Sequence, residues 1–286
     1  MSVQVLSIQS SVAFGYAGNS AAVFPLQRLG HDVVAIHTVH FSNHTGYGAT
    51  RGPLHSPEEV ADVVQGVADR DALGVDAVLS GYLGDPAMGA VVLSAVAEVR
   101  LLNPSAIYCC DPVMGDVGRG FFVKPGIPEY FRDHVVPHAD VLTPNHFELA
   151  FLTGRELPTL ADVLDAVAAL RERGPGVVLV TSVLHTSLEP GHLETIAVSD
   201  EGAWAVTSPI LPITTAGTGD LTSALFLAHL SLGPEEALLR TVSSVSAVLA
   251  ATVASGKREM QIVAAQDAIA HPPRDLPIRR LTTERP

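Results

Sequence analysis

The chain has 286 residues, of which 47% are hydrophobic and 16% charged, so it can bury a full core in one large α/β domain or two small ones. Its formal net charge of −13 argues against a nucleic-acid surface, which needs a concentrated set of Lys and Arg side chains. No basic leader precedes an apolar stretch at the start, and apolar runs are interrupted by Gly, Pro and Asp, so we expect a cytoplasmic protein that does not enter a membrane.

Short β-branched apolar runs alternate with longer segments of helical character through the first two thirds of the chain. This alternation is typical of a mostly parallel sheet with helices on both faces. We expect two of the connecting segments, Pro57–Ala68 and Leu160–Arg171, to be helices. The predicted strands are Val3–Ile8, Val33–Val39, Ala77–Ser80, Ile107–Cys110, Val141–Thr143 and Val177–Thr181.

The pattern changes in the last third of the chain. Two β-like runs, Glu194–Val198 and Ala203–Thr207, flank a polar turn and predict an antiparallel hairpin. The Ala-, Leu- and Val-rich segments Leu221–Leu230 and Pro234–Ala254 predict helices, and the last dozen residues, rich in Pro and Arg, predict a loosely held tail. Because neither a repeat nor a linker is visible, we expect residues 1–286 to form a single domain.

The most informative motif has two glycines that open directly into an apolar helical run, at Gly217 and Gly219. Such a turn presents successive backbone N–H groups to an anion without an intervening Cβ. The carboxylate of Asp220, at the mouth of that site, is placed where a general base would take a proton from an attacking hydroxyl. The alternative is an ordinary Asp N-cap after a glycine turn, so the motif needs support from elsewhere in the sequence.

Acidic residues follow two predicted strands. Asp111 and Asp116 come after one strand, while Thr143 ends the next strand and Glu148 follows it. The carboxyl ends of parallel strands are where open α/β folds bind ligands, and a hydrated Mg²⁺ on a triphosphate takes only a few protein oxygens. Each acid alone could be a turn or capping residue, but together with the glycine turn they favour phosphoryl transfer.

Other common sites are missing from the sequence. We find no GxxxxGK[ST] P-loop, no GxGxxG after the first strand, no HExxH and no GxSxG elbow. His37 and His40 lie in a predicted strand at a spacing expected to point them to opposite faces, so we assign no metal ligand among the histidines. The adjacent Cys109 and Cys110 predict buried strand thiols rather than a disulfide or metal site.

Seven short motifs follow one another along the chain: Ser7–Ser10, Gly15–Asn19, Phe41–Tyr47, Ser80–Tyr82, Asp111–Asp116, Thr143–Asn145 with Glu148, and Gly217–Asp220. In this order, they resemble the motifs of the pyridoxal kinases, a family of the ribokinase-like superfamily. The resemblance implies a central mostly parallel sheet between helices, a homodimer, ATP and Mg²⁺, often helped by K⁺, and transfer of the γ-phosphate to the 5′-hydroxymethyl of pyridoxal, pyridoxine or pyridoxamine.

The same resemblance implies a role for each matched residue. Asp220 would be the base, and the N–H groups of Gly217, Thr218 and Gly219 would stabilise the transferring phosphoryl group. The residues implied to bind the vitamer are Ser10, Thr45, Gly46, Tyr82 and Asp220. Those implied to bind ATP are Asp111, Asp116, Thr143, Glu148, Thr181 and Ser182, with Asp111 and Glu148 organising Mg²⁺, the latter through water.

Some positions depart from parts of the family. Thr181 and Ser182 stand where shorter bacterial members carry a Lys, so we expect hydroxyl contacts to nucleotide or K⁺ there, and Ser11 replaces a common His. Arg119 and Lys124, in the predicted loop over the nucleotide, could contact phosphate, but we interpret them as solvated charges. Two other functions stay open: a hydroxymethylpyrimidine kinase, which has the same fold and a similar substrate, and a module that binds a B6 vitamer without turnover.

Overall fold

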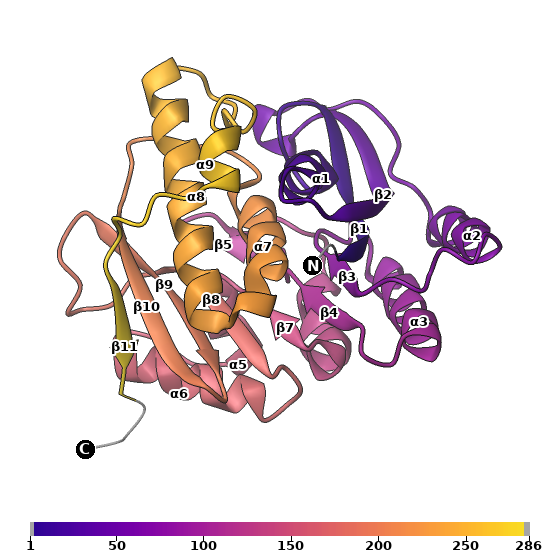
Figure 1. Cartoon of the computed structure of the whole chain (residues 1–286). Coiled ribbons are helices and arrows are strands. Elements are labelled where there is room, and N and C mark those ends of the chain that lie inside the picture. Colours follow the sequence, from indigo (N-terminus) through magenta and orange to yellow (C-terminus); the bar gives the residue numbers. More distant parts are fainter. Residues whose placement is uncertain (1–2, 283–286) are drawn as a thin grey trace.

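The computed structural model describes residues 3–282, and a nine-stranded sheet with the order β11-β10-β9-β8-β7-β4-β3-β1-β2 runs through them (Figure 1). Three strands at one end are antiparallel to their neighbours: β9 (His192–Ser199), β10 (Gly202–Pro209) and β11 (Ile278–Leu281). The parallel strands are β1 (Gln4–Phe14), β2 (Asp32–Asn43), β3 (Ala77–Ser80), β4 (Ile107–Cys110), β7 (Val141–Leu142) and β8 (Val177–Val183).

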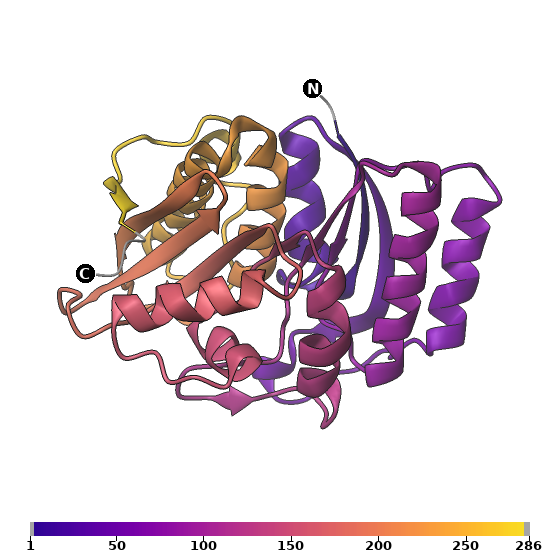
Figure 2. The same cartoon turned by 90° about the horizontal axis from the view of Figure 1, so that it is seen from below.

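Helices cover both faces of this sheet, and each face has its own apolar core (Figure 2). One layer holds α1 (Asn19–Arg28), α7 (Thr218–His229), α8 (Pro234–Ser255) and α9 (Gln266–Ala270). The other holds α2 (Pro57–Ala68), α3 (Pro86–Leu102), α4 (Ile127–Tyr130), α5 (His146–Thr153) and α6 (Leu160–Arg171). Short helical turns lie at 45–47, 131–138 and 230–232. The predicted α/β fold is therefore confirmed.

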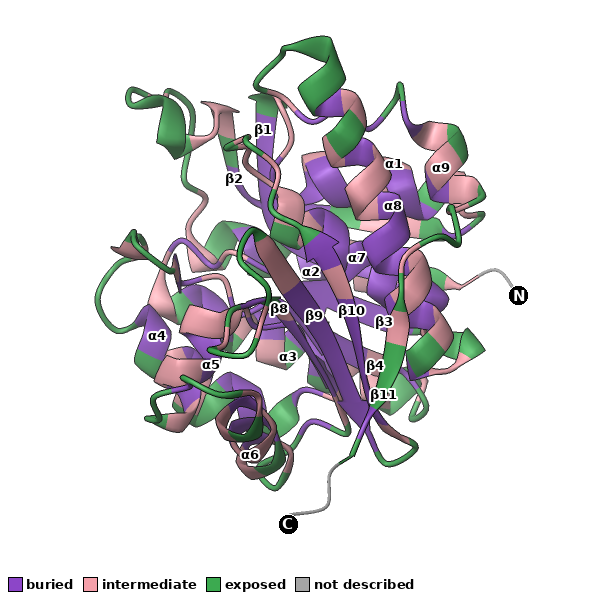
Figure 3. Ribbon diagram, turned by 90° about the vertical axis from the view of Figure 1, so that its left-hand side faces the viewer, coloured by how far each residue is buried: buried purple, intermediate pink, exposed green. Residues whose placement is uncertain are grey.

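Local sequence signals set several of these boundaries. Ser56 accepts a hydrogen bond from the Glu59 amide while Glu59 reaches back to the Ser56 amide, and Thr159 and Asp162 make the same capping box. Both helices begin and end where the sequence predicts. β9 and β10 are buried along most of their length, because helices cover both faces of the sheet (Figure 3). The thiols of Cys109 and Cys110 are free and buried on β4, as predicted.

The first two strands are longer than predicted, and β2 contains a bulge. Gln9 pairs with His37 and Ser11 pairs with His40, so β2 has one more residue than β1 in this interval. The extra residue restores His37 and His40 to the same exposed side, where their ring centroids lie 6.4 Å apart. The prediction that they point to opposite faces is therefore wrong, because it assumed an unbroken alternation.

The C-terminal segment is also better ordered than predicted. Residues 278–281 form β11, which pairs antiparallel with β10 so that Arg279 lies opposite Ala205. Without β11, β10 would present the unpaired N–H and C=O groups of an edge strand, and those groups hold the segment in place. A loosely held tail is thus the wrong description of residues 278–281, and residues 283–286 of that predicted tail lie outside the described residues.

One helix does reach membrane-spanning length, contrary to the expectation drawn from the interrupted apolar runs. Among residues 3–282, α8 is the helix that is long and apolar enough by length and composition. Half of that stretch is buried inside the protein, where α8 packs on α7, β9 and β10. Its hydrophobicity is accounted for by this core position.

Candidate active site

The predicted site residues gather at the carboxyl edge of the sheet, around the start of α7. Asp111 directly follows β4 and Thr143 directly follows β7, and both are only 4% exposed. A side chain on Gly219 of α7 would begin 3.5 Å from Asp111 Oδ2. The parallel strands and the glycine turn, distant in sequence, therefore meet at one place, as the position of ligand sites in open α/β folds predicts.

The glycine turn forms an uncapped helix start. Gly217 is the N-cap of α7 with φ of 81°, and no side chain caps the helix. A Cβ on Gly217 would collide with the carbonyl oxygen of Tyr16, so both the conformation and the space require glycine here. The first-turn N–H groups that follow have no helical acceptor, which makes this end suited to an anion.

Asp220 is the third residue of α7, not its N-cap, so the alternative capping role does not describe it. Burial raises the pKa of Asp220, while hydrogen bonds from the backbone N–H groups of Gly18 and of Asp220 itself act in the opposite direction. Its Oδ1 lies 3.6 Å from the position that a Cβ on Gly81 would take. A carboxylate with a raised pKa at the end of an anion site is suited to accept a proton.

Gly81 and Gln9 adjoin Asp220, and the sequence reading did not single them out as site residues. A Cβ on Gly81 would lie 2.6 Å from Gln9 Oε1, so a side chain at this position would force the Gln9 amide to move. Gln9 is fully buried, its amide nitrogen donates to Ser7 Oγ at 2.9 Å, and its Oε1 has no hydrogen-bond partner. In the sequence, the glycine between Ser80 and Tyr82 was the feature that could have pointed to this part of the site.

Asp111 places a buried carboxylate at the centre of this site. Burial, followed by the charges of Glu148 and Asp220, raises its pKa well above the usual range. Its Oδ2 and the nearby motif atom Thr143 Oγ1 are buried without a hydrogen-bond partner. Unsatisfied buried oxygens are costly, and they are the atoms that a hydrated cation on a triphosphate would satisfy.

A metal would have to depend on more than protein side chains at this site. Within residues 3–282, no three His, Cys, Asp or Glu side chains are grouped so that they could hold a metal ion. Mg²⁺ in kinases takes one or two carboxylates and completes its shell with water and substrate phosphates. The oxygens of Asp111 and Thr143 therefore fit Mg²⁺ delivered with a nucleotide, rather than a resident structural metal.

Glu148 ties two strand-end loops together. It accepts hydrogen bonds from the backbone N–H groups of Met114 at 2.9 Å, Gly115 at 3.4 Å and Asn145 at 2.8 Å. It is 3% exposed, and burial raises its pKa to about 8 against these hydrogen bonds. Both carboxylate oxygens already accept hydrogen bonds from the backbone, which holds the loop after β4 in its conformation. The predicted link from Glu148 to Mg²⁺ through water stays a prediction.

Asp116 lies in a small hairpin beside the site, formed by β5 (Gly115–Asp116) and β6 (Gly120–Phe121). Asp116 is half-buried, and its Oδ1 accepts the Val117 amide at 2.8 Å. Phe121 anchors the hairpin by edge-to-face contacts with Phe147 and Phe151, at centroid distances of 5.0 and 5.1 Å. The hairpin thus places Asp116 near Glu148, on the side that is predicted to bind the nucleotide.

Two charged residues of this hairpin region have partners on the protein surface. Lys124 pairs with Asp85 at 3.2 Å, and the Arg119 guanidinium lies 5.3 Å from the ring centroid of Phe122. Both arrangements fit the interpretation of these residues as solvated surface charges.

Thr181 and Ser182 form a second bulge. Val180 pairs with Ile196 but Val183 pairs with Glu194, so β8 contains one residue more than β9 between these pairs. Ser182 is exposed and has φ of 53°, which is unusual for a residue with a side chain. The Thr181 amide donates to the Pro144 carbonyl at 3.0 Å, which places the bulge next to the Thr143 strand end.

Apart from Asp220, the residues predicted to hold the vitamer come from three segments of the chain. Ser10 is buried on β1, and a Cβ on Gly18 would collide with its carbonyl oxygen. Tyr82 follows β3 and is half-buried, and burial raises its pKa. Thr45 and Gly46 lie in an exposed turn whose Gly46 amide donates to His44 Nδ1 at 3.0 Å.

That exposed turn is held by a loop that sequence reasoning missed. Arg258 donates to the Gly46 carbonyl at 2.9 Å, and its guanidinium lies 3.9 Å from the centre of the Tyr47 ring. Tyr47 donates in turn to Glu259. These residues help to line a cavity of about 810 Å³ bounded by residues 12–16 and 257–261. The following Met260 packs beneath Gly217, so this loop links the predicted vitamer turn to the anion site.

Comparison with known proteins identifies the family. Residues 17–265 match the model of the family described as phosphomethylpyrimidine kinase. The chain is 55% identical to pyridoxal kinase PdxY of Rubrobacter xylanophilus, over 98% of each chain, and 51% identical to that of Leifsonia xyli, over 98% of this chain and 100% of the other. This chain belongs to the pyridoxal kinase family.

A solved structure of the family supports the same conclusion. The pyridoxal kinase from Leishmania donovani in complex with ADP and pyridoxamine has a TM-score of 0.91 and 32% identity, with 98% of this chain and 99% of that chain covered. The predicted ribokinase-like fold and the predicted resemblance are both confirmed. The family model carries the name of the pyrimidine kinases, but relatives that share about half of their residues with this chain are pyridoxal kinases.

Proposed function

We propose that this chain is an ATP-dependent pyridoxal kinase, which transfers the γ-phosphate of ATP to the 5′-hydroxymethyl group of pyridoxal and also of pyridoxine and pyridoxamine, in B6 salvage. The observation that carries the proposal is the uncapped start of α7 with Asp220 in its first turn, in a chain whose close relatives are pyridoxal kinases. Two of the Leishmania structures contain ADP together with pyridoxamine or with pyridoxine, which are two of the three vitamers proposed here as substrates.

Asp220 is the general base in this proposal. Burial raises the pKa of Asp220, which makes its carboxylate a stronger base. A stronger base is better able to take the proton of the 5′-hydroxyl as its oxygen attacks the γ-phosphate. The N–H groups of Gly217, Thr218 and Gly219 have no acceptor within the helix, so they are free to donate to the phosphoryl group. They stabilise its negative charge during the transfer. Asp220 also contacts the vitamer through that same hydroxyl.

ATP and its Mg²⁺ bind on the side of the anion site that faces Asp111 and Thr143. Asp111 and Thr143 would hold the hydrated Mg²⁺ through their unpartnered oxygens, and Glu148 would act through water. Bound Mg²⁺ neutralises phosphate charge. Asp116 lies at the rim of the same region, while Thr181 and Ser182 offer a backbone bulge and hydroxyls to the nucleotide and to K⁺ where K⁺ is used.

The vitamer is held from the opposite side by Ser10, Thr45, Gly46 and Tyr82. The half-buried Tyr82 supplies a ring wall, and Ser10 and the Thr45 turn supply polar groups for the pyridine substituents. Because Arg258 holds the Gly46 carbonyl, the turn is positioned before substrate arrives.

We also propose a cytoplasmic homodimer with no nucleic-acid or membrane partner. Phe14, at the end of β1, is 59% exposed and makes an edge-to-face contact with Tyr47 at 6.1 Å, and such an exposed aromatic pair suits a subunit interface. Analytical ultracentrifugation checks the dimer, and a monomer at micromolar concentration would contradict it.

The deciding experiment is phosphorylation of pyridoxal with ATP, Mg²⁺ and K⁺, followed by the absorbance of pyridoxal 5′-phosphate, with hydroxymethylpyrimidine in parallel. Product from pyridoxal is expected. Product from the pyrimidine alone would keep the Asp220 chemistry and change the substrate, and no product in either, with pyridoxal still bound, would make the chain a vitamer-binding module.

A further inference from the structure

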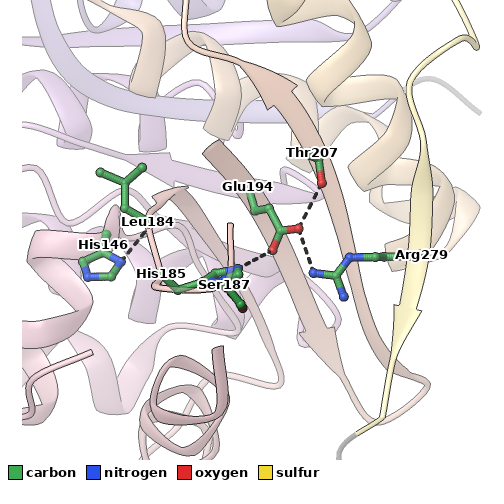
Figure 4. A network of polar contacts seen from close by, with 7 residues as sticks. All are labelled: His146, Leu184, His185, Ser187, Glu194, Thr207 and Arg279. Atoms are coloured by element: carbon green, nitrogen blue, oxygen red, sulfur yellow. Dashed lines mark hydrogen bonds and ion pairs between the residues drawn. The ribbon is translucent and has the colours of Figure 1, made fainter. Parts of the chain in front are cut away.

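A buried carboxylate lies away from the proposed reaction centre, on β9. The Glu194 side chain is 2% exposed and accepts hydrogen bonds from His185 Nε2 at 3.1 Å, Thr207 Oγ1 at 2.9 Å and Arg279 Nη2 at 2.7 Å (Figure 4). The His185 side chain is 3% exposed and its Nδ1 pairs with Ser187 Oγ at 3.0 Å. The proposed reaction uses none of these groups.

The charge on Glu194 depends on its partners. Burial by itself raises the pKa of Glu194, but the hydrogen bonds from Arg279, His185 and Thr207 outweigh burial and lower it. An ionised carboxylate in the interior is tolerated because it is paired and fully hydrogen-bonded. Removal of one partner would leave buried charge uncompensated and force the surrounding segments to move.

Those segments include the bulge proposed to contact the nucleotide. Glu194 pairs with Val183, directly after the extra residue at Thr181–Ser182, so it is the first β9 residue in register beyond the bulge. His185 lies two residues after Val183, in the segment that leaves β8. The Glu194–His185 hydrogen bond therefore fixes the position of the chain just after the bulge. Ser182 has φ of 53°, an unfavourable conformation that is kept only when the surrounding structure holds it.

The other side of the bulge is fixed to the Thr143 strand end. The Thr181 amide donates to the Pro144 carbonyl at 3.0 Å, and the Leu184 amide lies 3.4 Å from His146 Nδ1. Glu194 thus supplies the anchor on the β9 side, opposite these contacts (Figure 4).

The third partner of Glu194 comes from the end of the chain. Arg279 lies on β11, 85 positions away in sequence, and reaches across β10 to Glu194. Its neighbour Arg280 points the other way, over the Trp204 ring at 5.6 Å, and donates to the Glu201 carbonyl at 2.9 Å. The C-terminal strand therefore contributes a charge to the interior network as well as closing the sheet edge.

We propose that Glu194, held by Arg279 of the C-terminal strand and bonded to His185, is a positioning residue that sets the shape of the Thr181–Ser182 bulge and thereby the affinity for the nucleotide. The inference rests on the proposed function, because the assignment of Thr181 and Ser182 to the nucleotide belongs to it. Glu194 itself does not touch the reacting atoms.

The test compares Arg279→Met with its neighbour Arg280→Met, in the full chain. Both substitutions keep the aliphatic part of the side chain on β11, but only the first removes a donor from Glu194. Calorimetry measures ADP and pyridoxal affinities separately, and thermal melting reports stability. We expect Arg279→Met to raise the Kd for ADP by about tenfold, the equivalent of one hydrogen bond to a charged group, and to change the pyridoxal Kd less than about twofold.

Two further variants extend the comparison. Glu194→Gln, which removes the charge, should raise the ADP Kd at least as much as Arg279→Met. Thr207→Val removes one neutral donor, so it should raise the Kd by about threefold and stays informative where Glu194→Gln does not fold. Loss of stability without loss of ADP affinity would show a purely structural network and overturn the proposal.

An equal rise in the ADP Kd for Arg280→Met would also overturn it, because the effect would then come from the strand and not from Glu194. Turnover is a separate measurement. A wild-type chain that binds ADP but phosphorylates no substrate refutes the proposed function and leaves the positioning test intact, whereas one that binds no ADP overturns both.

Discussion

Replacement of Asp220 by Asn tests the proposed chemistry most directly. Asn keeps the volume of the side chain and one oxygen that can accept the Gly18 amide, so the start of α7 should keep its shape. It cannot accept the proton of the 5′-hydroxyl. The expected result is a fall in kcat of about 10²- to 10⁴-fold, the usual contribution of a positioned general base.

The same substitution has a predicted effect on the neighbouring carboxyl group. The charge of Asp220 is one of the causes that raise the pKa of Asp111, after burial and the charge of Glu148. Its removal should lower the pKa of Asp111 and so favour the ionised form that binds Mg²⁺. The affinity for Mg²⁺ with ADP should therefore be unchanged or higher in Asp220→Asn, while kcat falls.

The assay pairs turnover of pyridoxal with calorimetric ADP binding in the presence of Mg²⁺, for the wild type and Asp220→Asn. Turnover of the wild type should also decline as the pH falls through the raised pKa of Asp220, because the base becomes protonated. Full activity in the variant would remove Asp220 from the role of base. Parallel losses of activity and ADP affinity would point instead to a damaged anion site.

Three further predictions concern the backbone and the buried acids. Gly217→Ala should lower both the melting temperature and activity, because φ of 81° and the Tyr16 carbonyl exclude a Cβ, at a cost of about 1 kcal/mol or more in the free energy of unfolding; an unchanged melting curve would contradict this. Gly81→Ala should reduce kcat with ADP affinity retained, since its Cβ would lie 2.6 Å from Gln9 Oε1 on the vitamer side, and equal loss of ADP binding in calorimetry would argue against that placement. Finally, the folded chain holds a proton on Glu148 up to a pKa of about 8 whereas the unfolded chain releases it near 4.5, so the free energy of unfolding should fall as pH rises between these values in denaturant titrations, and a flat or rising profile would refute the assignment.

Much of the fold and the candidate site follows from local sequence. The helix at Pro57–Ala68 begins as predicted because its capping box and proline signals act between neighbouring residues. The site motifs could be combined for a similar reason. Since parallel strands end at a common edge, acids after β4 and β7 and the glycine turn at Gly217 had to approach one another.

Other features depended on tertiary structure. The bulge in β2 that brings His37 and His40 to one side is defined only by the register against β1, and the strand at Ile278–Leu281 forms because β10 has an edge to pair. The contact between Glu194 and Arg279 joins residues 85 positions apart. The sequence by itself determined the alternation of strands and helices and the ends of helices such as Pro57–Ala68 and Leu160–Arg171, because those signals act over a few residues. Only the tertiary structure decided registers, edge pairing and buried charge partners, because these depend on which groups the rest of the fold leaves unsatisfied.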